Sequence, residues 1–302
     1  MTIGTKMIQQ FNISFPLIMA PMFLVSNVDM LKAAIDNGII GAIPSLNYLD
    51  SEQLAADIQT LHQYKIGKKG TFAVNIIIKG NLKYKEHLEI ITKHKTPLVI
   101  TSLGDPAEVI QNVHVYGGRV FCDVTTLQHA EKAKDADGFI AVGQGAGGHA
   151  GNISLQVLVP SLRKAFPDKI IIGAGGVANS NSFKSILALG ADGVSAGTLF
   201  IASKESKASK EYKEAIINAK AKDITRTLIL SGVPATVIKS DYLYEMEEEL
   251  KLKRLNLNRG IELLKKSGHK ADYKQIFVAG QAVEFIDEEL SVSEIIKNLR
   301  QD

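Results

Sequence analysis

The chain has 302 residues and a formal net charge of +3. Its length suits one large domain or two of ordinary size. Aliphatic residues are plentiful, aromatic residues make up 6% and tryptophan is absent, a balance that favours alternating strands and helices over an all-β sandwich. Lysines and arginines are scattered, which is typical of a solvated surface and gives no nucleic-acid footprint.

Three features near the amino terminus and in the core bear on location. The longest apolar run near the start, residues 17–25, contains Pro21 and is far shorter than a membrane span. The amino terminus lacks the apolar core of a signal peptide. The single cysteine, Cys122, lies in an apolar run, is expected to be buried, and has no partner for a disulfide within the chain. We therefore expect a soluble, cytoplasmic protein.

Eight short apolar runs have the character of buried strands. In chain order they cover residues 16–22, 39–43, 71–75, 98–101, 120–123, 139–142, 170–174 and 193–196. Between them lie segments with helical spacing of apolar residues, including 51–64, 84–93, 155–166 and 180–189. Asn27, Ser51 and Asp105 are expected helix caps, and Thr125 with Gln128 has the spacing of a capping box.

This alternation predicts the fold class. Eight strand–helix repeats of roughly 20–30 residues are the count and rhythm of a (β/α)8 barrel, or TIM barrel, an α/β fold with parallel strands. An open doubly wound sheet is the main competitor, but it usually carries a GxGxxG turn after its first strand. Here the first strand ends in Ala20-Pro21-Met22, which favours the barrel.

About a hundred residues follow the eighth strand, and they include charged helical runs over 211–223, 242–254 and 259–266. We predict three parts: a barrel core over residues 1–200, a mainly helical excursion over the barrel mouth at 201–273, and a segment over 274–302 that closes the barrel. Within the last part, residues 291–300 fit an outer helix.

A glycine-rich loop follows the sixth strand. Five glycines lie within residues 143–151, together with His149. Glycine lets a ligand approach the backbone closely, and loops at the carboxyl ends of barrel strands carry the chemistry of such folds. A neutral imidazole can accept a proton near pH 7, so His149 is the candidate acid–base residue. A metal site is not expected, because the sequence has no HxH, HExxH or Cys/His cluster.

Glycines also follow the seventh and eighth strands. Gly175-Gly176 and Gly197-Thr198 occupy the usual phosphate site of a barrel, where backbone N–H groups bind the dianion. Side chains of Asn179, Ser180 and Thr198 are candidate extra donors. The alternative interpretation is that these glycines only form tight turns.

Other strand ends carry polar or soft side chains. Asn75 offers a donor and an acceptor that suit the edge of a flavin or nucleobase, or it caps the barrel mouth. Ala20, Pro21 and Met22 are candidates to face a planar ring, although Met22 alone is as well explained by the core. Asp123 also ends a strand, and it suits a cap of the next helix equally well.

Several of these segments together resemble a known family. Residues 145–151, Gly-Ala-Gly-Gly-His-Ala-Gly, resemble the xAGGHxG motif of nitronate monooxygenases, formerly called 2-nitropropane dioxygenases. Residues 20–22 look like the family's first motif, and residues 173–176, 189–194 and 196–200 resemble its FMN-phosphate region. Residues 231–235 and 280–281 are similar to later segments. Gly145 departs from the acidic or amide residue that members commonly carry there, and residues 38–41 replace the usual Gly-Gly-Leu-Gly.

The resemblance implies an FMN-binding barrel with His149 near the isoalloxazine ring. The residues expected at the cofactor by this resemblance and by position are Ala20, Pro21, Met22, Asn75, Gly148, Gly175, Gly176, Ala196, Gly197 and Thr198. In such enzymes the flavin oxidises an alkyl nitronate, O2 reoxidises the flavin, and the products are a carbonyl compound and nitrite. A nitronate needs no base, whereas a neutral nitroalkane would need His149 to remove its α-proton. The implied partners are a small-molecule substrate and O2, and a homodimer is left open.

Three alternatives stay open. An FMN-dependent enoyl-(acyl carrier protein) reductase shares the Ala-Gly-Gly-His loop but uses NAD(P)H, and it generally has Gly-Gly-Met in place of residues 20–22. A flavin-free barrel lyase or isomerase acting on a sugar phosphate usually needs a lysine at a strand end, and none of the eight predicted ends carries one. A non-catalytic flavin-binding protein would keep the phosphate glycines without needing His149.

Overall fold

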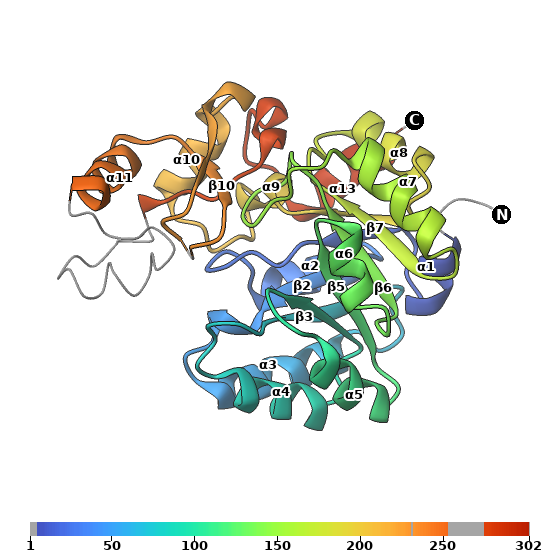
Figure 1. Ribbon diagram of the computed structural model, residues 1–302. Helices are drawn as coiled ribbons and strands as arrows, with labels where there is room; N and C mark the ends of the chain where they lie inside the picture. The colour runs from blue at the N-terminus through green and yellow to red at the C-terminus, as the bar shows by residue number, and fades with distance from the viewer. Residues whose placement is uncertain (1–4, 231, 253–274, 302) are drawn as a thin grey trace.

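The computed structural model describes residues 5–230, 232–252 and 275–301 (Figure 1). Eight parallel strands form a closed barrel in sequence order, and β1 pairs with β8 as well as with β2. The strands are β1 (Leu17–Met19), β2 (Ile40–Pro44), β3 (Thr71–Ile77), β4 (Leu98–Ser102), β5 (Arg119–Val124), β6 (Gly138–Val142), β7 (Ile170–Ala174) and β8 (Gly193–Ala196). The predicted TIM barrel is therefore confirmed.

The strands are buried on both faces, and alternate side chains divide between two apolar layers. On β5, Phe121 lies in the layer inside the barrel, while Val120 and Cys122 lie in the outer layer between the strands and the helices. The amino-terminal end of the barrel is closed by α1 (Thr5–Phe11), a helix that the sequence did not predict. Its Phe11 ring meets the Phe121 ring edge-on, with 5.5 Å between the centroids.

A helix follows each of the first seven strands, as predicted. These helices are α2 (Val28–Asp36), α3 (Ser51–Tyr64), α4 (Tyr84–Lys93), α5 (Ala107–Val115), α6 (Leu127–Lys132), α7 (Leu155–Ala165) and α8 (Ser180–Ala188). Asn27 caps α2 as expected, by accepting hydrogen bonds from the N–H groups of Asp29 and Met30. Asp105 accepts from the Ala107 N–H at the start of α5.

Two predicted caps were wrong by one residue. Asp50 rather than Ser51 caps α3, because its carboxylate accepts from the Glu52 N–H. Thr126 rather than Thr125 caps α6 and accepts from the His129 N–H. In both places two adjacent polar residues could serve as the cap, and the backbone geometry decides between them.

The described part of the chain after β8 contains strands as well as helices. It forms α9 (Thr198–Ile201), α10 (Lys210–Asn218), the 3-10 turn η2 (Ala221–Asp223), β9 (Ile224–Thr227), β10 (Ala235–Ile238), α11 (Asp241–Leu252), the 3-10 turn η5 (Gln281–Phe285) and α13 (Val292–Arg300). The helix predicted over 211–223 ends at Asn218, and β9 and β10 form an antiparallel pair that was not predicted. Figure 1 shows α10, β10 and α11 together on one side of the barrel. The helix predicted over 259–266 lies outside the described residues.

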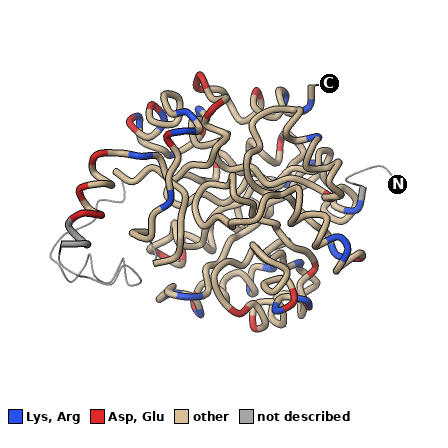
Figure 2. The backbone as a smooth tube through the Cα atoms, turned by 45° about the horizontal axis from the view of Figure 1, so that its top comes forward, with Lys and Arg blue, Asp and Glu red and all other residues tan. Residues whose placement is uncertain are grey.

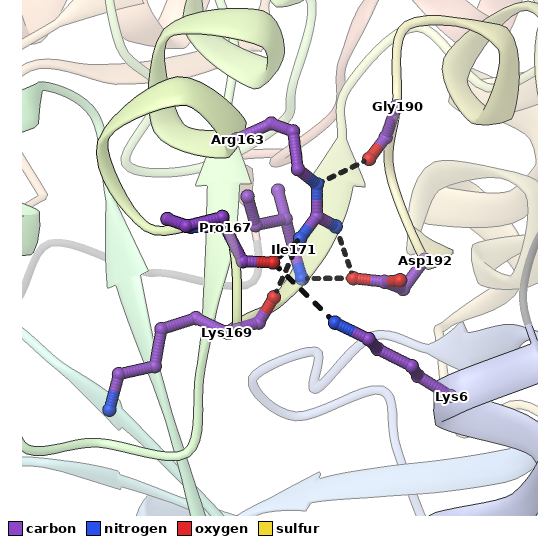
Figure 3. Close-up of polar contacts among 7 residues, drawn as sticks. All are labelled: Lys6, Arg163, Pro167, Lys169, Ile171, Gly190 and Asp192. Carbon is purple, nitrogen blue, oxygen red and sulfur yellow. Dashed lines mark hydrogen bonds and ion pairs between the residues drawn. The ribbon is translucent and has the colours of Figure 1, made fainter.

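One arginine ties together the amino-terminal ends of β7 and β8 (Figure 3). Arg163 donates to the carbonyls of Pro167 and Lys169 on one side, to the carbonyl of Gly190 on the other, and to the Asp192 carboxylate. Asp192 also accepts from the N–H of Ile171, at 2.9 Å. The opposite ends of these two strands carry the predicted phosphate loops.

Charged residues of both signs are distributed around the periphery, while the centre of the molecule is largely free of them (Figure 2). Among the described residues, no helix is long and apolar enough to cross a membrane. In that same part of the chain, no group of three His, Cys, Asp or Glu side chains is arranged to hold a metal ion.

Candidate functional site

The glycine-rich loop, residues 143–151, is fixed to three other segments. The carbonyl of Gly145 accepts from the Gly176 N–H at 3.2 Å and from the Gln281 N–H at 3.1 Å. Gly148 and Thr236 of β10 exchange two backbone hydrogen bonds, of 3.1 and 2.7 Å. Arg226 of β9 donates to the Gly151 carbonyl. The loop is therefore hydrogen-bonded to the barrel, to the β9–β10 pair and to the start of η5.

Several glycines of this loop are needed by the protein's own packing. A β-carbon on Gly147 would lie 2.8 Å from the backbone of Ala279 and of Gly280, and one on Gly151 would lie 2.6 Å from the Val142 carbonyl oxygen. Gly148 has φ +71°, which other residues rarely adopt. The sequence suggested that these glycines make room for a ligand, but close contact between backbones explains Gly147 and Gly151.

His149 follows Gly148 and is half-buried. Burial lowers the pKa of its imidazole from the usual 6.5. The ring is therefore mainly neutral at pH 7 and able to accept a proton.

The two predicted phosphate loops lie beside the glycine-rich loop and the end of β1. A β-carbon on Gly175, which has φ +123°, would lie 2.8 Å from the Ala146 nitrogen. Gly176 has φ +68° and is exposed, with nothing within 4 Å of its β-carbon position. A β-carbon on Gly197 would lie 3.4 Å from Ala20 Cβ and 3.6 Å from Met22 Cγ.

The end of β1 is joined directly to the end of β8. The Ala20 N–H donates to the Ala196 carbonyl at 2.8 Å. Pro21 is half-buried, and Met22 is buried with its N–H donating to Ser26 Oγ at 3.0 Å. One side of the barrel mouth is therefore formed by Ala20, Pro21, Met22 and Ala196.

The three polar side chains predicted to add donors for a phosphate have different positions. Thr198 Oγ1 accepts from the Gly280 N–H at 3.0 Å, which leaves its own proton available. Asn179 instead caps α8 and accepts from the Ser182 N–H. Ser180 donates to the carbonyl of Gln301. Of the three, Thr198 keeps a proton for a ligand, whereas Asn179 and Ser180 are engaged within the protein.

A polar relay crosses the rim at the ends of β3, β4 and β5. Asn75 Nδ2 donates to the Ile100 carbonyl at 3.1 Å and to Ser102 Oγ at 2.9 Å. Ser102 Oγ donates to Asp123 Oδ2 at 2.5 Å. Burial raises the pKa of the Asp123 carboxyl from 3.8 to about 6, and the hydrogen bond from Ser102 acts in the opposite direction.

The relay was only partly predicted. Asn75 was singled out, but Ser102 was missed, because the predicted fourth strand stopped one residue short of it. Asp123 was considered as a helix cap, yet Thr126 caps α6 and Asp123 accepts from Ser102 instead. The signal was present in the alternation along β5, since Asp123 lies two residues after the inward-facing Phe121.

Comparison with known proteins identifies the family of the chain. The family model described as nitronate monooxygenase matches residues 46–302. A Staphylococcus saprophyticus protein named "Probable nitronate monooxygenase" is 25% identical over 295 residues, covering 82% of each chain. A Mycobacterium tuberculosis protein named as a monooxygenase is 29% identical over 167 residues, and this match spans 54% of the present chain and 44% of the relative.

Solved structures with the same fold include FabK from Thermotoga maritima. It has a TM-score of 0.84 and 28% identity, with 97% of this chain and 94% of that chain covered. Nitroalkane oxidase from Streptomyces ansochromogenes has a TM-score of 0.80 and 22% identity over 96% of each chain, a likeness that shows the fold. Because the family model spans most of the chain, including the glycine-rich loop and both phosphate loops, the chain belongs to the nitronate monooxygenase family and is a flavin-dependent oxidoreductase.

Proposed function

We propose that this protein uses FMN and O2 to oxidise alkyl nitronates to carbonyl compounds and nitrite. One observation carries the proposal: the loop that bears His149 is hydrogen-bonded to the loop after β7, through the Gly176 N–H and the Gly145 carbonyl. This hydrogen bond joins the loop with the proton acceptor to the loop of the predicted phosphate site. Membership of the nitronate monooxygenase family supports the same chemistry.

The residues at the mouth fit FMN. The space beside Gly176, where a β-carbon would meet nothing within 4 Å, leaves its loop open to a phosphate. We infer that Gly175 and Gly197 hold that phosphate through their N–H groups and Thr198 through its hydroxyl. Gly176, whose N–H is bound to the Gly145 carbonyl, would line the space beside the phosphate. Ala20, Pro21, Met22, Ala196, Gly148 and Asn75 would then lie along the ring.

Bound FMN supplies a two-electron acceptor that O2 reoxidises. The protein's part is to position the substrate and to handle its proton. A nitronate arrives without its α-proton, so His149 has no proton to remove from it. With a neutral nitroalkane, the neutral imidazole of His149 accepts the α-proton, and its lowered pKa keeps it available for this at neutral pH.

We infer that β9 and β10, which belong to the excursion predicted over 201–273, cover the barrel mouth. β10 pairs with Gly148 through Thr236, and Arg226 of β9 holds Gly151. Both contacts are made next to His149, so this part of the excursion would limit access of water and substrate to the imidazole.

An enoyl reductase is the second candidate. FabK from Thermotoga maritima and the enoyl reductase domain of MlnA share the fold, with TM-scores of 0.84 and 0.76. Such an enzyme would reduce its flavin with NAD(P)H rather than with a nitronate.

A spectrum of the purified protein and two mixing experiments test these alternatives. We expect the visible absorption of oxidised flavin, and chromatography of the released cofactor should identify FMN. Propyl-2-nitronate should cause O2 uptake and nitrite formation, whereas NADPH should leave the flavin oxidised. Rapid bleaching by NADPH without nitrite from the nitronate would favour the reductase. Bound flavin that reacts with neither would identify a non-catalytic flavoprotein.

The role of His149 is tested by comparing two substrates in one variant. His149→Gln should retain FMN and nitronate turnover, while turnover of the neutral nitroalkane falls by about 10²–10⁴, the usual contribution of a general base. An equal loss with both substrates would mean that His149 does not act as the base.

A further inference from the structure

Asp123 has an unusual position for a charged residue. Within the eight barrel strands, all of which the structure describes, only Arg119 and Asp123 are charged, and Arg119 is exposed at the start of β5. Asp123 follows the inward-facing Phe121 by two residues, so its side chain lies inside the barrel, at the mouth.

The neighbours of Asp123 hold one of its oxygens and leave the other available. Ser102 Oγ donates to Oδ2, and among the described residues nothing donates to Oδ1 and no lysine or arginine forms an ion pair with the carboxylate. With a pKa of about 6, raised by burial, the carboxyl is mainly ionised at neutral pH. The barrel mouth therefore carries an uncompensated negative charge.

In the relay of Asn75, Ser102 and Asp123, Asn75 donates to Ser102 and Ser102 donates to Asp123. The Ile100 carbonyl can only accept, so the Asn75 side chain must present its NH2 group to β4. The Ser102 proton goes to Asp123, so Ser102 must accept from Asn75. Both Asn75 N–H groups are thereby used, and the free polar atoms on this side of the mouth are two acceptors, Asn75 Oδ1 and Asp123 Oδ1.

We propose that Asp123 is a charge-setting residue of the flavin site, which disfavours the electron-rich reduced flavin, and that Ser102 is a positioning residue that keeps Asn75 presenting its oxygen. The proposal rests on the proposed flavin site. A negative charge in a partly buried position acts strongly on a nearby group, because little water screens it. Charge near the ring is one of the means by which a protein tunes a bound flavin.

The test measures FMN binding in both redox states, independently of turnover. Apoprotein is titrated with oxidised FMN and, without O2, with reduced FMN, and the ratio of the two dissociation constants is compared between wild type and Asp123→Asn. We expect the ratio to move at least tenfold toward the reduced form, which corresponds to about 30 mV for a two-electron couple. Asp123→Glu should keep the wild-type ratio, because it keeps the charge.

Two more variants make the result specific. Asp105→Asn removes an exposed carboxylate from the loop after β4 and should leave the ratio unchanged. Ser102→Ala should weaken binding of both forms of FMN at alkaline pH, where Asp123 stays ionised, with little change in their ratio. If Asp123→Asn does not fold, Asp123→Ser provides the neutral comparison.

The outcomes separate this inference from the proposed function. A wild-type protein that binds no FMN would overturn both. A wild type that binds FMN, with a neutral variant whose ratio stays within threefold of wild type, would overturn the role of Asp123 alone. A shift of the same size in Asp105→Asn would also contradict it, since a general loss of negative charge would then explain the result.

Discussion

Gly280 lies directly against the carbonyl of Gly145: a β-carbon on Gly280 would stand 2.5 Å from that oxygen. The same oxygen accepts hydrogen bonds from the N–H groups of Gly176 and Gln281. The Gly280 N–H, in turn, donates to Thr198 Oγ1. The segment before η5 thus connects the glycine-rich loop with both predicted phosphate loops, and its position determines whether these loops act together.

Replacing Gly280 with alanine should therefore displace the glycine-rich loop and weaken FMN binding. The added β-carbon would also lie 2.6 Å from the Gly147 nitrogen, and both contacts are with backbone, which cannot move aside cheaply. We expect FMN affinity to fall at least tenfold, with a loss of about 1–3 kcal/mol in the free energy of unfolding. Gly67→Ala is the control: φ is +76° and its β-carbon meets nothing, so it should cost about 1–2 kcal/mol without changing FMN affinity. Unchanged FMN binding in Gly280→Ala would contradict this account.

Thr198→Val should distinguish FMN from riboflavin. Valine has nearly the shape of threonine but cannot accept from the Gly280 N–H or donate to a phosphate. We expect FMN binding to weaken at least tenfold, because a hydrogen bond to a charged group contributes about 1.5–3 kcal/mol. Riboflavin, which lacks the phosphate, should lose much less affinity, and Thr198→Ser should bind both like wild type. An equal loss of affinity for the two ligands would mean that Thr198 only accepts the hydrogen bond from Gly280 and does not contact the phosphate.

Arg163→Met should destabilise the barrel where β7 and β8 begin. The change leaves the Asp192 carboxylate, whose side chain is 14% exposed, without its cation. The carbonyls of Lys169 and Gly190 lose their side-chain donor, while the Pro167 carbonyl keeps its hydrogen bond from Lys6. We expect a loss of about 3 kcal/mol in the free energy of unfolding. Arg119→Met is the control, because Arg119 is 49% exposed and its partner Asp137 keeps His114 and the Val120 N–H as hydrogen-bond partners. We expect this change to cost at most about 1 kcal/mol. Equal losses in urea unfolding would refute the special role of Arg163.

The barrel was predictable because its signal is local and repeated. Runs such as Phe139 to Val142 are buried on both faces in a parallel sheet, so each is continuously apolar and is bounded by helical segments with a different period. The predicted strand positions hold within a few residues for this reason. The cap of α2 was also predicted correctly as Asn27, while the neighbouring Ser26 accepts from the Met22 N–H instead.

The elements that were missed depend on contacts distant in the sequence. β9 and β10 are short, and β9 contains the exposed Arg226, so neither has a strong strand pattern. The two strands hydrogen-bond to each other, and β10 also pairs with Gly148, which is distant in the sequence. Helix α1 is recognisable as a barrel plug only once Phe11 is seen against Phe121.

In the site, too, some features follow from local sequence patterns and others depend on contacts between distant residues. The rule that strand ends meet at one rim groups Asn75, Gly175 and Gly197 from the sequence alone. It could not reveal that the Gly176 N–H is occupied by Gly145, or that Asn179 is used as a helix cap. Nor could it distinguish Asp123 as a cap from Asp123 as a partner of Ser102, because that choice depends on which neighbouring side chain lies within hydrogen-bonding distance.

His87 on α4 should make stability depend on pH. Its side chain is buried, and neither ring nitrogen makes a hydrogen bond with any described residue. Burial lowers its pKa from 6.5 in the folded state, so the unfolded chain binds a proton first as the pH falls. The contribution of neutral His87 to the free energy of unfolding is therefore complete above about pH 6.5, and it is lost as the pH falls toward the folded-state pKa.

His87→Leu should raise the free energy of unfolding by about 1 kcal/mol at alkaline pH, because it removes two unsatisfied polar atoms. Its advantage should grow in urea unfolding at about pH 5. A gap between His87→Leu and wild type that stays constant with pH would show that His87 is not held neutral by burial.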